Sequence, residues 1–154
     1  MQDVVRCLTD DGFVSRGGRG RDVCTVVFQR HIVPLQRRAG LEPVRVKFVV
    51  EYSIADAAER PGWWEAQCVG WAYDVLDGGG RPILAFHWHP RESGHVTRPH
   101  LHAYGAHESV DLHKLHPPTG HVTLSSIVRF LIEGLGVLPR RPNWQAVLDR
   151  RARV

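Results

Sequence analysis

The segment AQCVGWAYDVLDGGGRPILAFHWH, residues 66–89, decides the fold that the sequence predicts. Two runs rich in β-branched and aromatic residues, 66–76 and 82–89, flank the turn sequence DGGGR at 77–81. Three successive glycines tolerate the positive φ values that a tight hairpin demands. We therefore predict two antiparallel strands joined by a short loop.

The second of these strands has two unlike faces. Side chains alternate along a strand, so even-numbered and odd-numbered positions point to opposite sides of the sheet. One face is bulky and apolar, and the other begins apolar and ends in two histidines: Leu84, Phe86 and Trp88 against Ile83, Ala85, His87 and His89.

Other segments extend this pattern in both directions. Residues 23–28 have the composition of a strand, and residues 44–52 alternate apolar and basic side chains with the period of a half-buried strand. Residues 30–40 contain Pro34 and predict an irregular or short helical connection. A short strand is expected at 100–104, after a loop rich in proline and glycine.

Two helices are predicted near the end of the chain, within residues 123–152. Apolar residues from Leu124 to Leu135 follow helical spacing behind Thr123 or Ser125 as the N-cap. A second helix begins at Asn143 and has a basic end that suits a helix C-terminus. Strands first and helices last predict an α+β fold, an antiparallel β-meander with the C-terminal helices packed on one face.

We expect one domain over residues 1–154, with a sheet-forming part at 23–104 and a helical part at 123–152. Residues 1–22 predict no element and can be interpreted as flexible. The sequence RGGRGR at 16–21 indicates a mobile surface loop, with an anion-binding segment as the alternative.

Charge and cysteine content narrow the class of protein. The net charge is +4 and the pI about 9.3, which permits an anionic partner such as nucleic acid. Arginine supplies nearly all the positive charge, which suits phosphate binding but also follows from a GC-rich genome. Three separated cysteines without a Cys-x-x-Cys pair argue against a zinc finger or a disulfide framework. They predict a reducing, cytoplasmic location, and neither a signal peptide nor a membrane partner is expected.

Histidine is the main functional clue, because nine of the ten histidines lie between residues 87 and 121. Two His-x-His pairs stand out, His87/His89 and His100/His102. Residues 100–104 can return antiparallel beside 84–89. A register that pairs His89 with His100 and His87 with His102 would then gather four imidazoles on one face. A slip of one residue would split the pairs between the two faces.

One interpretation of this cluster is a metal site. His87, His89, His100 and His102 would bind a divalent ion such as zinc or iron, because imidazole is a ligand that both accept. The result would be a metal-dependent hydrolase or oxygenase. Nearby carboxylates could complete the ligand set or orient a ring: Glu92, Glu108 and Asp111.

Two further interpretations need no metal. His100 and His102 could act as acid and base in phosphodiester cleavage, since histidine titrates near neutral pH. Arg98 would stabilise the developing negative charge, and Tyr104 lies close in sequence to complete a compact catalytic set. Alternatively, the histidines form a solvated surface of a non-enzymatic domain that binds a partner protein.

The hairpin at 70–90, the sequence PHLHA at 99–103 and a following helix with a polar cap resemble the TumE-type toxins of bacterial toxin–antitoxin modules. The resemblance covers about residues 65–135, and Pro99, His100 and His102 match the histidine motif of that family. It implies a cytoplasmic toxin-like protein that acts on RNA and pairs with a helix-turn-helix antitoxin. The long N-terminal region, the second helix and the His87/His89 pair depart from the family pattern.

Overall fold

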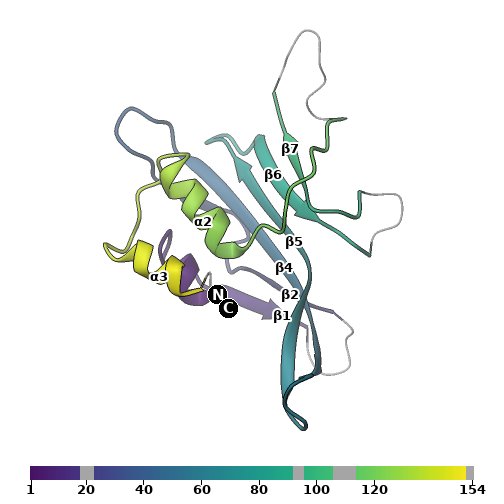
Figure 1. The fold of residues 1–154 in the computed structure, drawn as a ribbon. Helices are drawn as coiled ribbons and strands as arrows, with labels where there is room; N and C mark the ends of the chain where they lie inside the picture. The colour runs from purple at the N-terminus through teal and green to yellow at the C-terminus, as the bar shows by residue number, and fades with distance from the viewer. Residues whose placement is uncertain (18–22, 92–95, 106–113, 152–154) are drawn as a thin grey trace.

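A computed structural model describes residues 1–17, 23–91, 96–105 and 114–151 (Figure 1). Within these residues seven strands form one antiparallel sheet in the order β1-β2-β4-β5-β6-β7, and β3 pairs with β4 beside β2. The strands are β1 (Phe13–Arg16), β2 (Cys24–Phe28), β3 (Val33–Leu35), β4 (Val44–Asp56), β5 (Trp64–Leu76), β6 (Pro82–Trp88) and β7 (His100–Ala103).

Helices α2 (Leu124–Glu133) and α3 (Trp144–Arg151) lie on one face of the sheet beside the short N-terminal helix α1 (Gln2–Val5), as Figure 1 shows. The predicted α+β class, a β-meander with C-terminal helices, is confirmed. In the part of the chain that the structure describes, no helix combines the length and apolar character needed to span a membrane.

The core lies between the sheet and the helices. Alternate residues of β4 and β5 turn apolar side chains toward α2, whose own apolar face is buried against them. These side chains are less than 8% exposed: Val44, Val46, Phe48 and Val50 of β4, Trp71, Tyr73 and Val75 of β5, and Ile127, Val128, Leu131 and Ile132 of α2. The opposite face of the sheet has no helix over it in Figure 1.

Residues 30–40 differ from the prediction in part, because three of them form strand β3, whereas the residues on either side of it are irregular as predicted. Pro34 sits at the middle of β3 with its ring exposed, opposite Arg45. Among the described residues, β3 pairs with β4 alone, so its other edge faces no strand. Proline is tolerated on such an edge strand, because an N–H that would point to the free edge has no ladder hydrogen bond to lose.

The N-terminal segment also differs from the prediction. The sequence indicated no element in residues 1–22, yet α1 buries Val4 and Val5 in the core and β1 pairs with β2. A helix of four residues is too short for its period to stand out in the sequence. Four of the six residues of RGGRGR, 18–21, lie outside the described residues.

The cap of α2 is Thr123, one of the two predicted candidates, and its Oγ1 accepts a hydrogen bond from the Ser126 backbone N–H at 3.1 Å. We expect Thr123→Ala to lower the free energy of unfolding by about 1 kcal/mol, because one N–H of the first turn loses its acceptor. Urea unfolding measures the change. Thr123→Ser keeps the oxygen and serves as the control; a serine variant as unstable as the alanine variant would contradict the cap.

Candidate metal centre

The histidine cluster is built by the pairing of β6 with β7. His87 lies directly opposite His100, and Ala85 opposite His102. Residues opposite one another in an antiparallel pair share a face, and so do residues two apart on one strand. His87, His100 and His102 therefore lie on one face of the sheet. Phe86 points the other way and contacts Phe130 of α2 at 5.9 Å between ring centroids, so the cluster occupies the face away from the helices.

The predicted register, His89 with His100 and His87 with His102, is wrong by two residues. β6 ends at Trp88, so His89 follows the strand and the ladder aligns His87 with His100. A shift of two residues leaves every side chain on its predicted face. The alternation of apolar and polar residues therefore specified the face but could not distinguish the two registers.

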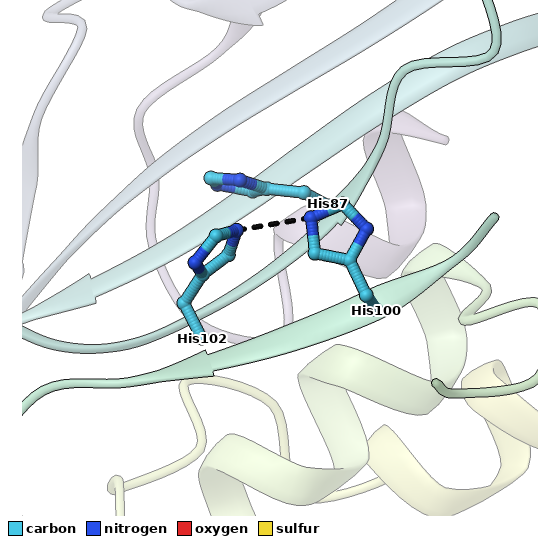
Figure 2. Close-up of side chains that lie close together, drawn as sticks. All are labelled: His87, His100 and His102. Atoms are coloured by element: carbon cyan, nitrogen blue, oxygen red, sulfur yellow. Dashed lines mark hydrogen bonds between the residues drawn. The ribbon is translucent and has the colours of Figure 1, made fainter. Parts of the chain in front are cut away.

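Three imidazole nitrogens converge in this cluster, as Figure 2 shows. One ligand atom from each of His87, His100 and His102 lies within 4.8 Å of the others, and the group could hold a metal ion. Nε2 of His100 lies 3.0 Å from Nε2 of His102. Ligand nitrogens about 3.3 Å apart surround a tetrahedral zinc ion, so the widest pair needs to close by about 1.5 Å.

The hydrogen bonds of His100 specify its tautomer. Nδ1 lies 2.7 Å from the Arg98 carbonyl oxygen, which can only accept, so Nδ1 carries a proton and donates it. In the neutral ring Nε2 then bears the lone pair that points at His102. A backbone carbonyl behind a histidine in this way is the usual support for a metal ligand, because it orients the ring and raises its basicity.

Asp74 orients the ring of His87 in the same way, as a hydrogen-bond acceptor behind it. The Nε2 atom of His87 donates to Oδ1 of Asp74 at 2.8 Å, and Lys47 Nζ lies 3.6 Å from Oδ2. Burial of Asp74 raises its pKa, but the hydrogen bond and charge of His87, together with Lys47, outweigh it and hold the pKa below its ordinary value. Asp74 is therefore a carboxylate at neutral pH, and whenever the ring of His87 is in its neutral form with the proton on Nε2, Nδ1 bears the lone pair.

His100 is the buried member of the cluster, with 3% of its surface exposed. Desolvation lowers its pKa, the hydrogen bond to the Arg98 carbonyl opposes this, and the positive charges of His87, His116 and His89 lower it further. The pKa of His100 lies below its ordinary value of 6.5. The neutral form is the one that binds a metal, so this shift favours a ligand role.

The pKa of His100 makes stability depend on pH. A depressed pKa in the folded state gives stabilisation that is present above the unfolded value of 6.5 and is lost as pH falls through the folded value. We expect the free energy of unfolding in EDTA to fall between about pH 7.5 and about pH 5. Urea unfolding at both pH values should show a smaller fall in His100→Gln, and equal falls in the two proteins would contradict the shift.

Other groups named from the sequence lie around the three histidines. Tyr104 stacks beside His102 with ring centroids 6.2 Å apart, and burial and the charge of Asp74 raise the Tyr104 pKa. The His89 ring lies 5.1 Å from that of His87. Arg98 gives its backbone carbonyl to the cluster, whereas its side chain is exposed. Glu92, Glu108 and Asp111 lie outside the described residues.

Two residues near the cluster were not predicted from the sequence, Asp74 and His116. The His116 ring lies 4.5 Å from that of His102 and 5.3 Å from that of His100. Asp74 had a detectable signal, because it is a lone acid between the apolar residues Tyr73 and Val75 in a strand. His116 had none, since it lies in no repeating pattern of the sequence.

The outer edge of β7 is covered by the segment that follows His116. The Leu101 N–H donates to the Pro117 carbonyl at 2.9 Å, and the Thr119 N–H donates to the Pro99 carbonyl at 2.8 Å. His100 also forms a bridge with Pro118. The strand that carries two of the three histidines is therefore held on both sides.

Comparison with known proteins gives no relative: no protein-family model, no curated protein and no solved structure matches this chain.

Proposed function

We propose that this chain is a metal-dependent hydrolase whose ion is bound by His87, His100 and His102. The observation that carries the proposal is the convergence of three imidazole nitrogens within 4.8 Å, two of them on rings already oriented by acceptors. Three histidine ligands and an open fourth position are the arrangement of catalytic zinc sites. Histidines with only a structural role have no need of such convergence.

The ligand set favours zinc over iron. Non-haem iron sites in oxygenases use two histidines and one carboxylate. Among the described residues, the carboxylate that contacts this cluster is Asp74, which is engaged by His87 and Lys47 and so supports a ligand from behind. Three neutral imidazoles leave the ion its full positive charge, which favours activation of water.

A zinc ion in this position would lower the pKa of a bound water to about 7 and supply hydroxide as the nucleophile. The chain's own residues would orient the ligand rings and donate a hydrogen bond to the substrate. Asp74 and the Arg98 carbonyl keep two ligand rings oriented. The Tyr104 phenol, protonated at neutral pH, is placed beside His102 to donate a hydrogen bond to a reacting oxygen.

RNA cleavage without a metal is a second candidate, favoured by the short contact between His100 and His102. Two imidazoles that share one proton across 3.0 Å can act as base and acid on a phosphodiester. This mechanism agrees with the resemblance to toxin-like proteins that act on RNA beside an antitoxin partner. The exposed Arg98 would contact phosphate.

One experiment separates the two candidates. Untagged metal-free protein is titrated with zinc by calorimetry, and total RNA is then incubated with the protein in EDTA and in added zinc. Zinc binding at about one ion per chain supports the metal centre. RNA cleavage that occurs in EDTA and is lost in His100→Gln would reject the metal-dependent mechanism and support the metal-free one. Failure to bind zinc, with no RNA cleavage, would reject both.

The contribution of Asp74 gives an independent check on the metal centre. We expect Asp74→Asn to weaken zinc binding about 10-fold to 100-fold, because an amide is a weaker acceptor for His87 and removes a negative charge behind the ligand. Competition with a chromophoric chelator measures the affinity. Asp77→Asn, on the exposed turn beyond β5, is the matched control, and equal affinities in the two variants would count against the proposed ligand set.

A further inference from the structure

The β4–β5 hairpin extends well beyond the rest of the sheet and forms an arm, residues 52–68 (Figure 1). In the described part of the chain, the ladder from β2 ends at Tyr52 and that from β6 ends at Trp71. Past these points β4 and β5 pair only with each other, from Ser53 with Gln67 to Asp56 with Trp64. No other described strand pairs with either edge of this two-stranded ribbon.

The tip of the arm is an ordered turn. The Ala57 N–H donates to the Trp63 carbonyl at 2.8 Å, and the Trp63 N–H donates to the Arg60 carbonyl at 3.0 Å. Gly62 adopts a φ of 82°, which a glycine takes without strain. A two-stranded ribbon by itself is only marginally stable in water, so a surface packed against the arm would stabilise it.

The two faces of the arm differ in character. Residues paired across the ladder share a face, so the register assigns each side chain to one side. One face is apolar apart from Asp56 near its tip and carries Ile54, Trp64, Ala66 and Cys68. The other is largely polar and carries Ser53, Ala55, Glu65 and Gln67. Such alternation is the pattern of a ribbon with one buried side.

The apolar face continues the core face of the sheet beyond the helices that cover it. Ile54 follows Val46, Phe48 and Val50 in the same alternation along β4, yet it is 55% exposed. Trp64, opposite Asp56, is 71% exposed. Large exposed apolar side chains in one patch mark an interaction surface, and tryptophan is the residue type most often central to one.

Charge identifies the kind of partner. The arm carries three carboxylates, Asp56, Glu59 and Glu65, and one arginine, Arg60. The whole chain has a charge of +4 and the arm −2, so the remainder of the chain has +6. An acidic arm is repelled by nucleic acid and by anionic lipid, and it is attracted to the basic body of another molecule of this chain.

We propose that this chain forms a dimer by exchange of arms, in which the apolar face of each arm packs on the body of a second copy. Exchange is reciprocal under two-fold symmetry, so each molecule contributes its arm and a receiving surface. The arm has 17 residues, and a stable interface needs about 20–30 residues a side, so the proposed dimer requires part of each side to come from the receiving body.

Adjacent tryptophans provide a matched pair of variants. Trp64 lies on the apolar face of β5, whereas Trp63 precedes the strand, in the turn at the tip of the arm; they are 71% and 64% exposed. Sedimentation equilibrium over micromolar to hundreds-of-micromolar protein measures the dimer dissociation constant. We expect the unchanged chain to form a dimer. Trp64→Ser should raise the dimer dissociation constant at least about tenfold, whereas Trp63→Ser should change it by no more than about twofold.

Several results would overturn the proposal. The unchanged chain could stay monomeric at every concentration, or Trp63→Ser and Trp64→Ser could weaken the dimer equally. Salt gives a further test, because an acidic arm on a basic body must dissociate more readily as NaCl rises from about 50 mM to about 500 mM. A dimer strengthened by salt would mean that the two arms meet each other, and would reject docking on the body. Circular dichroism checks that both serine variants remain folded.

Discussion

The double variant His100→Gln/His102→Gln is expected to lose zinc binding completely, from about one ion per chain to a level indistinguishable from buffer. Both residues offer an Nε2 atom at the point where the three rings converge, and they lie on one short strand. Glutamine keeps a polar side chain of similar length but has no imidazole nitrogen to bind the ion. Elemental analysis of untagged protein after gel filtration measures the bound metal.

The control for this variant is His121→Gln. His121 lies edge-on to Trp71 and Trp88, with ring centroids 5.9 Å and 5.8 Å away, on the helix-covered side of the sheet. It is a histidine with packing contacts and no part in the cluster, so its zinc content should match that of the unchanged chain. Zinc retained by the double variant would place the ion elsewhere and refute the proposed ligands.

Phe48→Ala is expected to lower the free energy of unfolding by about 3–5 kcal/mol, the largest stability change that we predict. Phe48 is fully buried at the centre of β4, and its ring lies 5.2 Å from those of Phe28 and Tyr73. Alanine removes these contacts and leaves a cavity that β4, paired on both sides, cannot close. Chemical denaturation with fluorescence detection measures the change.

Phe13→Ala is the matched control for this substitution. Phe13 lies on the edge strand β1, is partly buried, and contacts Phe28 at 4.8 Å. The same change there should cost clearly less, because solvent already reaches the site and the edge can relax. Equal losses of unfolding free energy in the two variants would contradict the position of Phe48 at the centre of the core.

The sequence was informative wherever one period repeated over several residues. Alternation in β6 showed that His87 shares a face with Ala85 and that Phe86 turns away from it. Helical spacing located α2, and the threonine before it was one of the two residues predicted as its cap. These features are local, because each depends on neighbours within one strand or one turn.

Features that join distant segments were not predicted. The register of β6 and β7 depends on where β6 ends, and two registers that differ by two residues satisfy the same alternation. Asp74 meets His87 only because β5 pairs with β6, and His116 reaches the cluster by returning past β7. The irregularity between Glu51 and Tyr52, where the register shifts, likewise left no pattern in the sequence.

The position of the three histidines across β6 and β7 has a consequence for local unfolding. β7 has four residues and brings two of the ligands, while β6 brings the third. An ion bound by all three histidines would link the two strands. Its binding free energy would add to the free energy needed to separate β7 from β6. Amide hydrogen exchange in β7 would then be slower in metal-bound than in metal-free protein and would report the occupancy of the metal centre. The central strands β4 and β5 would exchange through global unfolding whether or not metal is bound.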